Sequence, residues 1–198
     1  MNYLSHVLSN GLRIVHLPVE SPVSYCGFAV NAGTRDEAAD EFGLAHFVEH
    51  MLFKGTDKRS PKSIAEEIES LGGYLNAFTS KEHTCYYGRG LSRHLVKTFK
   101  VLADMVQHSI FKEKEIKKEA AVIVDELLDI EDSPDEYIFD LFENNVYAGT
   151  PLGRPIIGTQ SNITGFGRED FINYMEENYT CQRLMIVASG NIEHEKIV

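Results

Sequence analysis

Alternating hydrophobic and polar positions mark several β-strands along this chain. Residues 3–8 and 12–17 alternate on either side of Ser9-Asn10-Gly11, and an Asn-Gly pair between two such runs is a strong signal for a β-hairpin. The apolar run 25–30 has the length of a third strand. Three further strands are predicted, at 74–79, 83–89 and 184–188.

Helical spacing of apolar residues dominates the rest of the sequence. The segment 43–53 carries four apolar residues on one helical face. A second helix is bounded by a Ser-Pro start and a Gly-Gly stop. The acidic segment 34–42 and the Gly-, Pro- and Thr-rich segment 148–168 are predicted to be surface loops. The second helix is predicted at 60–71, and further helices are predicted at 91–108, 112–129, 135–146 and 169–179.

Length and composition are those of an ordinary globular domain. The 198 residues, 43 % hydrophobic and 25 % charged, fit a single domain spanning 1–198. Residues 191–198 resemble the opening turns of a helix without a stop signal. We therefore expect a fragment that lacks a last helical region.

Charge and cysteine content narrow the possible partners and compartment. The formal net charge of −11 repels phosphate, which argues against a nucleic acid or an anionic membrane as partner. No window approaches the ~18 consecutive apolar residues of a membrane span. The three cysteines form no CxxC pair, which indicates a reducing compartment. The sequence therefore predicts a cytoplasmic protein.

The five residues His46-Phe47-Val48-Glu49-His50 carry the clearest chemical signal. Residues four apart share one face of a helix, so both imidazoles can reach one metal ion. Glu49 lies beside them and can take a proton from a water at the ion. This is the inverted form of the HExxH zinc motif. Because the flanking residues are apolar, three ionisable groups here would be costly without a partner such as a metal.

A catalytic zinc site needs a third protein ligand, and spacing alone leaves several candidates open. Glu119 and Glu126 lie seven residues apart on nearly the same face of the predicted helix 112–129. That region is crowded with acidic residues, most of which are expected to face solvent. Cys85, Cys181 and His83 compete as ligands.

The sequence resembles the M16 peptidases, the family of pitrilysin, insulin-degrading enzyme and the mitochondrial processing peptidase. The segment from Gly43 to Thr56 is similar to the family's zinc-site segment, and the likeness continues nearly end to end. The other matching segments are Leu71–Thr79, Glu119–Glu126, Pro151–Thr159 and Ser189–Ile192.

This resemblance implies a fold and a set of site residues. The fold is α+β, a largely antiparallel sheet with helices mainly on one face. His46, His50 and Glu126 are implied as the ligands of one Zn²⁺ per chain. Glu49 is implied as the general base, and Glu119 as a supporting glutamate that orients the site.

The resemblance also implies a mode of substrate binding. A peptide would add as a strand to the sheet edge at 74–79, with Asn76 and Ala77 nearest the scissile bond and Phe78 and Thr79 alongside. Asn76 could equally bond its own backbone. The acidic run 125–136 could favour basic peptides, although a solvated helix end explains it more simply.

Family members pair this domain with a second, similar one, in the same chain or in a paired subunit. That second half is absent here, so the isolated chain is expected to bind zinc with little proteolysis.

Two other functions remain open on the sequence. A small metal-dependent lyase of the S-ribosylhomocysteinase type has a similar motif and length, but it would use a cysteine such as Cys85 or Cys181 in place of Glu126. A catalytically silent assembly subunit is the other possibility, although such relatives typically lose part of the motif.

Overall fold

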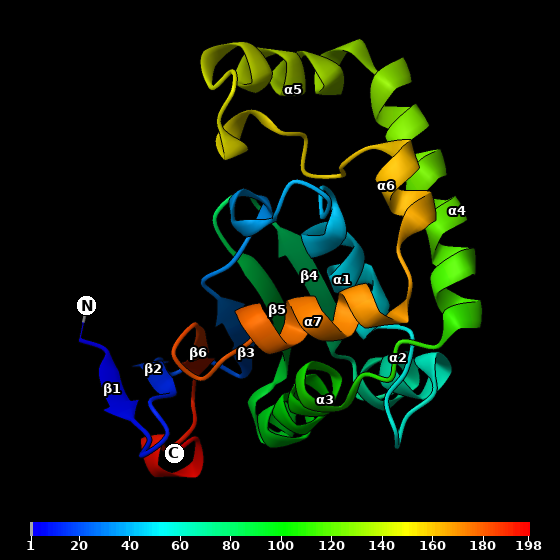
Figure 1. Cartoon of the computed structure of the whole chain (residues 1–198). Helices are drawn as coiled ribbons and strands as arrows, with labels where there is room; N and C mark the ends of the chain where they lie inside the picture. The colour runs from blue at the N-terminus through cyan, green and yellow to red at the C-terminus, as the bar shows by residue number, and fades with distance from the viewer. Residues whose placement is uncertain (1) are drawn as a thin grey trace.

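The computed structural model describes residues 2–198, which form one six-stranded sheet with helices around it (Figure 1). The strand order is β1-β2-β6-β3-β5-β4. Neighbouring strands are antiparallel except β2 and β6, which run parallel. The strands are β1 (Leu4–Val7), β2 (Arg13–Pro18), β3 (Val23–Val30), β4 (Tyr74–Thr79), β5 (Thr84–Leu91) and β6 (Leu184–Gly190).

Seven α-helices and four short 3₁₀ turns connect these strands in the described part of the chain. The helices are α1 (Leu44–Leu52), α2 (Pro61–Glu69), α3 (Leu95–His108), α4 (Glu113–Asp132), α5 (Pro134–Val146), α6 (Gln160–Gly165) and α7 (Arg168–Asn178). The 3₁₀ turns are η1 (Thr34–Asp36), η2 (Ser92–His94), η3 (Pro151–Gly153) and η4 (His194–Lys196).

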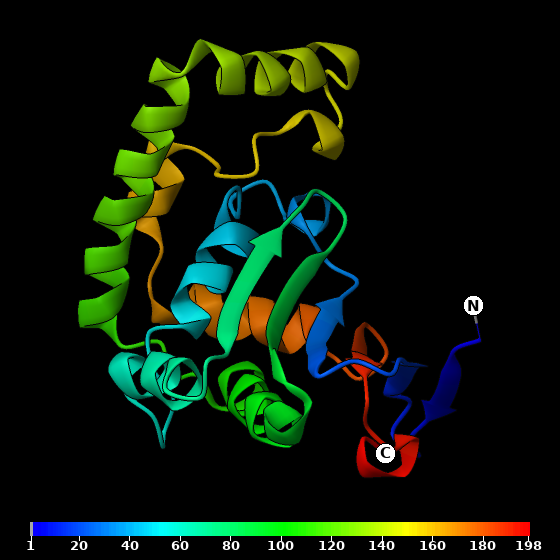
Figure 2. The same cartoon turned by 180° about the vertical axis from the view of Figure 1, so that it is seen from behind.

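Helices cover one face of the sheet, and the core lies between them and the strands. Along β3 and β6 the side chains on one face are buried, whereas many of those on the other face are not. Helices α1, α3 and α7 lie on the buried side (Figure 1), and the view from behind shows β4 and β5 uncovered (Figure 2). The largest fully buried side chains come from both layers, among them Tyr86, Phe47 and Phe171. This arrangement confirms the predicted α+β class.

Most predicted elements form with bounds shifted by a few residues. The hairpin closes at the expected Asn-Gly turn, and the Ser60 hydroxyl caps α2 by accepting a hydrogen bond from the Ser63 N–H at 3.1 Å. The helix predicted over 91–108 begins only at Leu95, because β5 extends to Leu91 and η2 follows it.

Two predictions are wrong. The segment 148–168 is not simply a surface loop, since it contains α6, whose start is capped by the Thr159 hydroxyl. Ile157 and Ile163 of this segment are buried against the core. The end of the chain, 191–198, contains only the 3₁₀ turn η4 and not two turns of α-helix.

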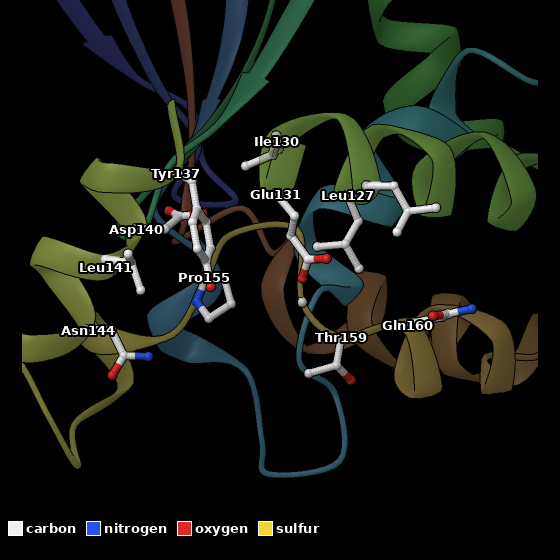
Figure 3. A pocket seen from close by; sticks show the side chains of 12 residues that line it. Leu127, Ile130, Glu131, Tyr137, Asp140, Leu141, Asn144, Pro155, Thr159 and Gln160 are labelled. Carbon is white, nitrogen blue, oxygen red and sulfur yellow. The ribbon is translucent and has the colours of Figure 1, made fainter. Parts of the chain in front are cut away.

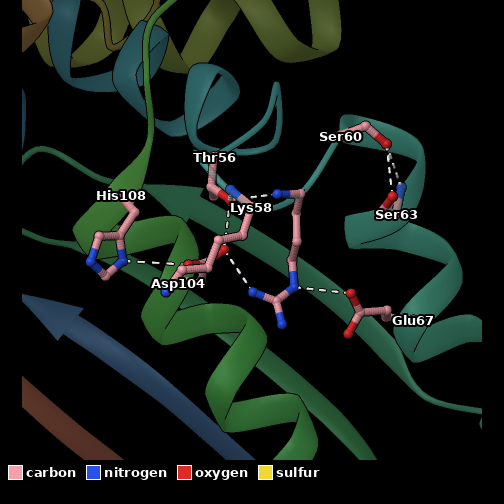
Figure 4. A network of polar contacts seen from close by, with 8 residues as sticks. Thr56, Lys58, Ser60, Ser63, Glu67, Asp104 and His108 are labelled. Carbon is pink, nitrogen blue, oxygen red and sulfur yellow. Dashed lines mark hydrogen bonds and ion pairs between the residues drawn. The ribbon is translucent and has the colours of Figure 1, made fainter.

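A partly buried ionic network, centred on the buried Asp104, holds the segment after α1 against α3 (Figure 4). The Asp104 carboxylate accepts hydrogen bonds from the Thr56 hydroxyl at 2.6 Å and from Arg59 Nη1 at 2.7 Å. Arg59 Nε also donates to Glu67 on α2 at 3.0 Å. Burial alone would raise the pKa of Asp104, but the bonds from Thr56 and Arg59 outweigh it and lower that pKa.

We expect Asp104→Ala to lower the free energy of unfolding by about 3 kcal/mol, because it leaves Arg59 without its buried partner. Chemical denaturation measures this value. The exposed neighbour Asp57 serves as control, and Asp57→Ala should cost less than about 0.5 kcal/mol. Since the folded-state pKa of Asp104 is depressed, its contribution is complete above about pH 4 and is lost as the pH falls through the folded value. Equal losses in the two variants would contradict this account of the network.

Candidate metal centre

Helix α1 presents two histidines one turn apart. Its apolar residues, including Phe47 and Val48, are fully buried, which fixes the rotation of the helix about its axis. On the remaining face lie His46 and His50, whose ring centroids are 4.6 Å apart. Both side chains are largely covered, with 12 % and 22 % exposure.

Helix α4 runs alongside α1 and brings Glu126 to the two imidazoles. The Glu126 carboxylate oxygens lie 3.7 Å from His46 Nε2 and 3.6 Å from His50 Nε2. One donor atom from each residue falls within 4.8 Å of the others. Ligands of a tetrahedral zinc ion lie roughly 3.4 Å apart, so two imidazole nitrogens and a carboxylate at these spacings fit zinc.

The outer side of His50 is held by a second carboxylate. Glu119, which lies about two turns before Glu126 on nearly the same face of α4, accepts at 2.9 Å from His50 Nδ1 and pairs with Lys54 at 2.6 Å. A carboxylate that accepts a hydrogen bond from Nδ1 fixes the orientation of the ring and keeps the proton on Nδ1. The lone pair of Nε2 is then free to bind a metal. Lys54 was not predicted as part of the site, although it lies only four residues after His50, just beyond the end of α1.

Burial shapes the protonation of these groups. It lowers the pKa of His46 to about 3, with a contribution from His50, so the imidazole is neutral and can bind a metal at physiological pH. Burial also raises the pKa of Glu126, an effect opposed by His50. For Glu119, the bonds from His50 and Lys54 outweigh burial and lower the pKa.

Glu49 lies between α1 and the edge strand β4. Its carboxylate accepts a hydrogen bond from the Thr79 hydroxyl at 2.5 Å. Burial raises the pKa of Glu49, while the bond from Thr79 and the charge of His50 act in the opposite direction. A partly buried carboxyl with a raised pKa is suited to accept and release a proton.

The four residues predicted to bind substrate all lie on β4. Among the strands of residues 2–198, β4 pairs only with β5 and forms one edge of the sheet. Asn76 and Phe78 point to the uncovered face, and Ala77 and Thr79 point toward the helices. The Asn76 side chain accepts from the Ala77 N–H at 2.9 Å. Its present contact is therefore with its own strand.

The competing ligands lie outside the donor cluster. Among the described residues, the cluster of metal-binding groups consists of His46, His50 and Glu126. His83 instead contacts the Ser80 hydroxyl, and Cys85 and Cys181 are free thiols. Of the acidic run 125–136, most members are exposed to solvent.

A cavity of about 290 Å³ lies in the angle between α4 and α5 (Figure 3). Its lining includes Leu127, the residue after Glu126 in the sequence, and residues of the segment 155–160 form one side. Apolar and acidic groups share its wall, and burial raises the pKa of Asp140 there. The other labelled lining residues are Ile130, Glu131, Tyr137, Leu141, Asn144, Pro155, Thr159 and Gln160.

Comparison with known proteins identifies the family to which this chain belongs. The family model described as Insulinase (Peptidase family M16) matches residues 15–160. A protein of Rickettsia felis named as a zinc protease is 40 % identical over 199 residues, which cover 100 % of this chain and 48 % of the relative. The probable mitochondrial-processing peptidase subunit beta of Arabidopsis thaliana is 41 % identical over 192 residues, or 96 % of this chain and 36 % of the relative.

The fold is also similar to that of solved protease structures. The crystal structure of a protease from Helicobacter pylori matches with a TM-score of 0.93 and 25 % identity over 99 % of this chain and 48 % of that one. The chain therefore belongs to peptidase family M16, as its resemblance indicated. It spans about half the length of the curated relatives it matches. None of the described helices is long and apolar enough to cross a membrane.

Proposed function

We propose that this chain is a zinc-dependent endopeptidase domain. The observation that carries the proposal is the meeting of His46 and His50 from α1 with Glu126 from α4, at spacings that fit one zinc ion. The name of a relative, a zinc protease, supports zinc as the metal. We propose one Zn²⁺ per chain, held by these three residues.

Zinc, when bound, supplies Lewis acidity that polarises the peptide carbonyl and makes a water more acidic. Glu49 takes the proton of the attacking water and delivers it to the leaving amine. Its raised pKa suits both transfers. Glu119 keeps the His50 ring oriented through the bond to Nδ1.

The peptide substrate is proposed to add to β4 as a further strand. Backbone groups on the outer side of an edge strand are free to pair with an extended chain. Asn76 and Ala77 would lie nearest the scissile bond, with Phe78 and Thr79 beside it. The Asn76 side chain must then release the Ala77 N–H that it now bonds.

A second M16 domain, in the same chain or in a paired subunit, is the proposed protein partner. Helix α5 has no buried residue and exposes large apolar side chains such as Phe139 at 68 % and Phe142 at 63 %. Exposed apolar groups of this kind mark interaction surfaces. Without that domain the site stays open to water, so we expect low activity from the 198 residues alone. A cytoplasmic location stays a prediction.

The direct test is hydrolysis of a quenched fluorescent peptide by the chain together with its second domain. We expect activity that a chelator abolishes and that zinc restores, with the zinc content returning to one per chain. A silent assembly subunit would bind zinc without turnover under the same conditions. Turnover that survives complete zinc removal would contradict the proposal.

A further inference from the structure

Helix α1 begins without a cap from its own sequence. Its N-cap is Gly43, with a φ of 93°, and the first turn contains no acidic residue. The first N–H groups of a helix have no partner within the helix and need one elsewhere. His46 lies in this first turn. A group that accepts hydrogen bonds from these N–H groups therefore also influences the position of His46 in the metal centre.

Glu37, six residues before the helix N-cap, supplies the missing cap. Its carboxylate accepts from the Gly43 N–H at 3.1 Å and from the Ala45 N–H at 2.8 Å, one bond to each oxygen. The residue is only 5 % exposed. Burial raises the pKa of Glu37 to about 8, although the two N–H donors oppose the shift. The chain thus keeps an ionisable group where burying it is costly.

The segment that carries Glu37 is itself held from the other side. Arg154 Nη1 donates to the Glu37 carbonyl at 3.0 Å, and its guanidinium lies 3.9 Å above the Phe42 ring. The Arg154 carbonyl accepts from Lys81 Nζ at 2.7 Å, beside the end of β4. A side chain on Gly43 would come within 2.5 Å of the Ile157 carbonyl, so the two backbones pack directly together.

We propose that Glu37 is a positioning residue for the metal centre, acting through the backbone of the first turn of α1. The Ala45 N–H that it holds is in the residue directly before His46. When that bond is lost, the first turn can fray and His46 loses its fixed distance to His50 and Glu126. The Glu37 carboxylate bonds backbone N–H groups and none of the three proposed metal ligands, so its effect is on affinity and geometry.

The test compares Glu37→Gln and Glu37→Ala with Ser60→Ala, which removes the cap of α2 away from the centre. Zinc affinity is measured on the purified chain by competition with a chelating dye, and site geometry by the absorption spectrum of bound Co²⁺. We expect Glu37→Ala to weaken zinc binding by about tenfold or more and to alter the Co²⁺ spectrum. Glu37→Gln, which keeps one acceptor, should fall between it and the wild type.

Ser60→Ala should lower the melting temperature without changing zinc affinity or the spectrum. Wild-type zinc affinity and an unchanged Co²⁺ spectrum in the Glu37 variants would overturn the inference, and Glu37→Gln alone decides if Glu37→Ala does not fold. The inference rests on the proposed zinc site. Failure of the wild-type chain to bind zinc would instead overturn the proposed function, and this inference with it.

Discussion

Replacing Glu49 by Gln is expected to lower kcat for peptide hydrolysis by about 10²–10⁴-fold, the usual contribution of a positioned acid–base group. Gln fills the same space and can still accept the hydrogen bond from Thr79, but it cannot take the proton of the attacking water. Zinc content and melting temperature should stay at wild-type values, since Glu49 is not among the three donors. Steady-state kinetics with a quenched peptide, beside elemental analysis, measures all three quantities.

The matched control is Glu66→Gln, an identical change at an exposed position on α2. It should leave kcat unchanged. A Glu49→Gln enzyme that keeps its zinc and turns over at the wild-type rate would show that another group handles the proton.

Glu126→Gln is expected to remove zinc from the purified chain. A neutral amide oxygen is a much weaker ligand than a carboxylate, and only His46 and His50 remain. The loss of affinity should exceed the ~10–100-fold typical of removing a hydrogen-bond partner of a ligand. Elemental analysis and dye competition measure it, and the fold should persist because Glu126 is 40 % exposed.

Glu113→Gln, at the exposed start of the same helix, is the control and should retain full zinc. Metal retained after Glu126→Gln would favour the lyase interpretation, in which a cysteine is the third ligand. The structure favours Glu126 as the third ligand, because neither Cys85 nor Cys181 lies in the donor cluster.

Local signals made the elements around the centre predictable. The spacing of His46, Glu49 and His50 within an apolar helix pattern required no knowledge of distant contacts. The Ser-Pro start of α2 and the Asn-Gly turn of the first hairpin are likewise short-range signals. Sequence spacing alone left Glu126 level with its rivals, and the resemblance to M16 peptidases was needed to select it.

Features that depend on packing between distant segments were missed. Glu37 caps a helix that starts seven residues later. Arg154, which donates a hydrogen bond to the Glu37 carbonyl, lies 117 residues away in the sequence. No periodicity carries such a contact. In the same way, Ile163 is buried because α6 packs against α4, and Ile157 lies against Gly43 at the start of α1. The Gly, Pro and Thr content of their segment is nevertheless typical of a loop.

The most direct test of the account is a crystal structure of the chain with zinc supplied, solved with anomalous data at the zinc edge. We expect one peak about 2.0–2.2 Å from His46 Nε2, His50 Nε2 and a Glu126 carboxylate oxygen. A peak coordinated by other side chains, or by the two histidines with Glu126 turned away, would contradict it.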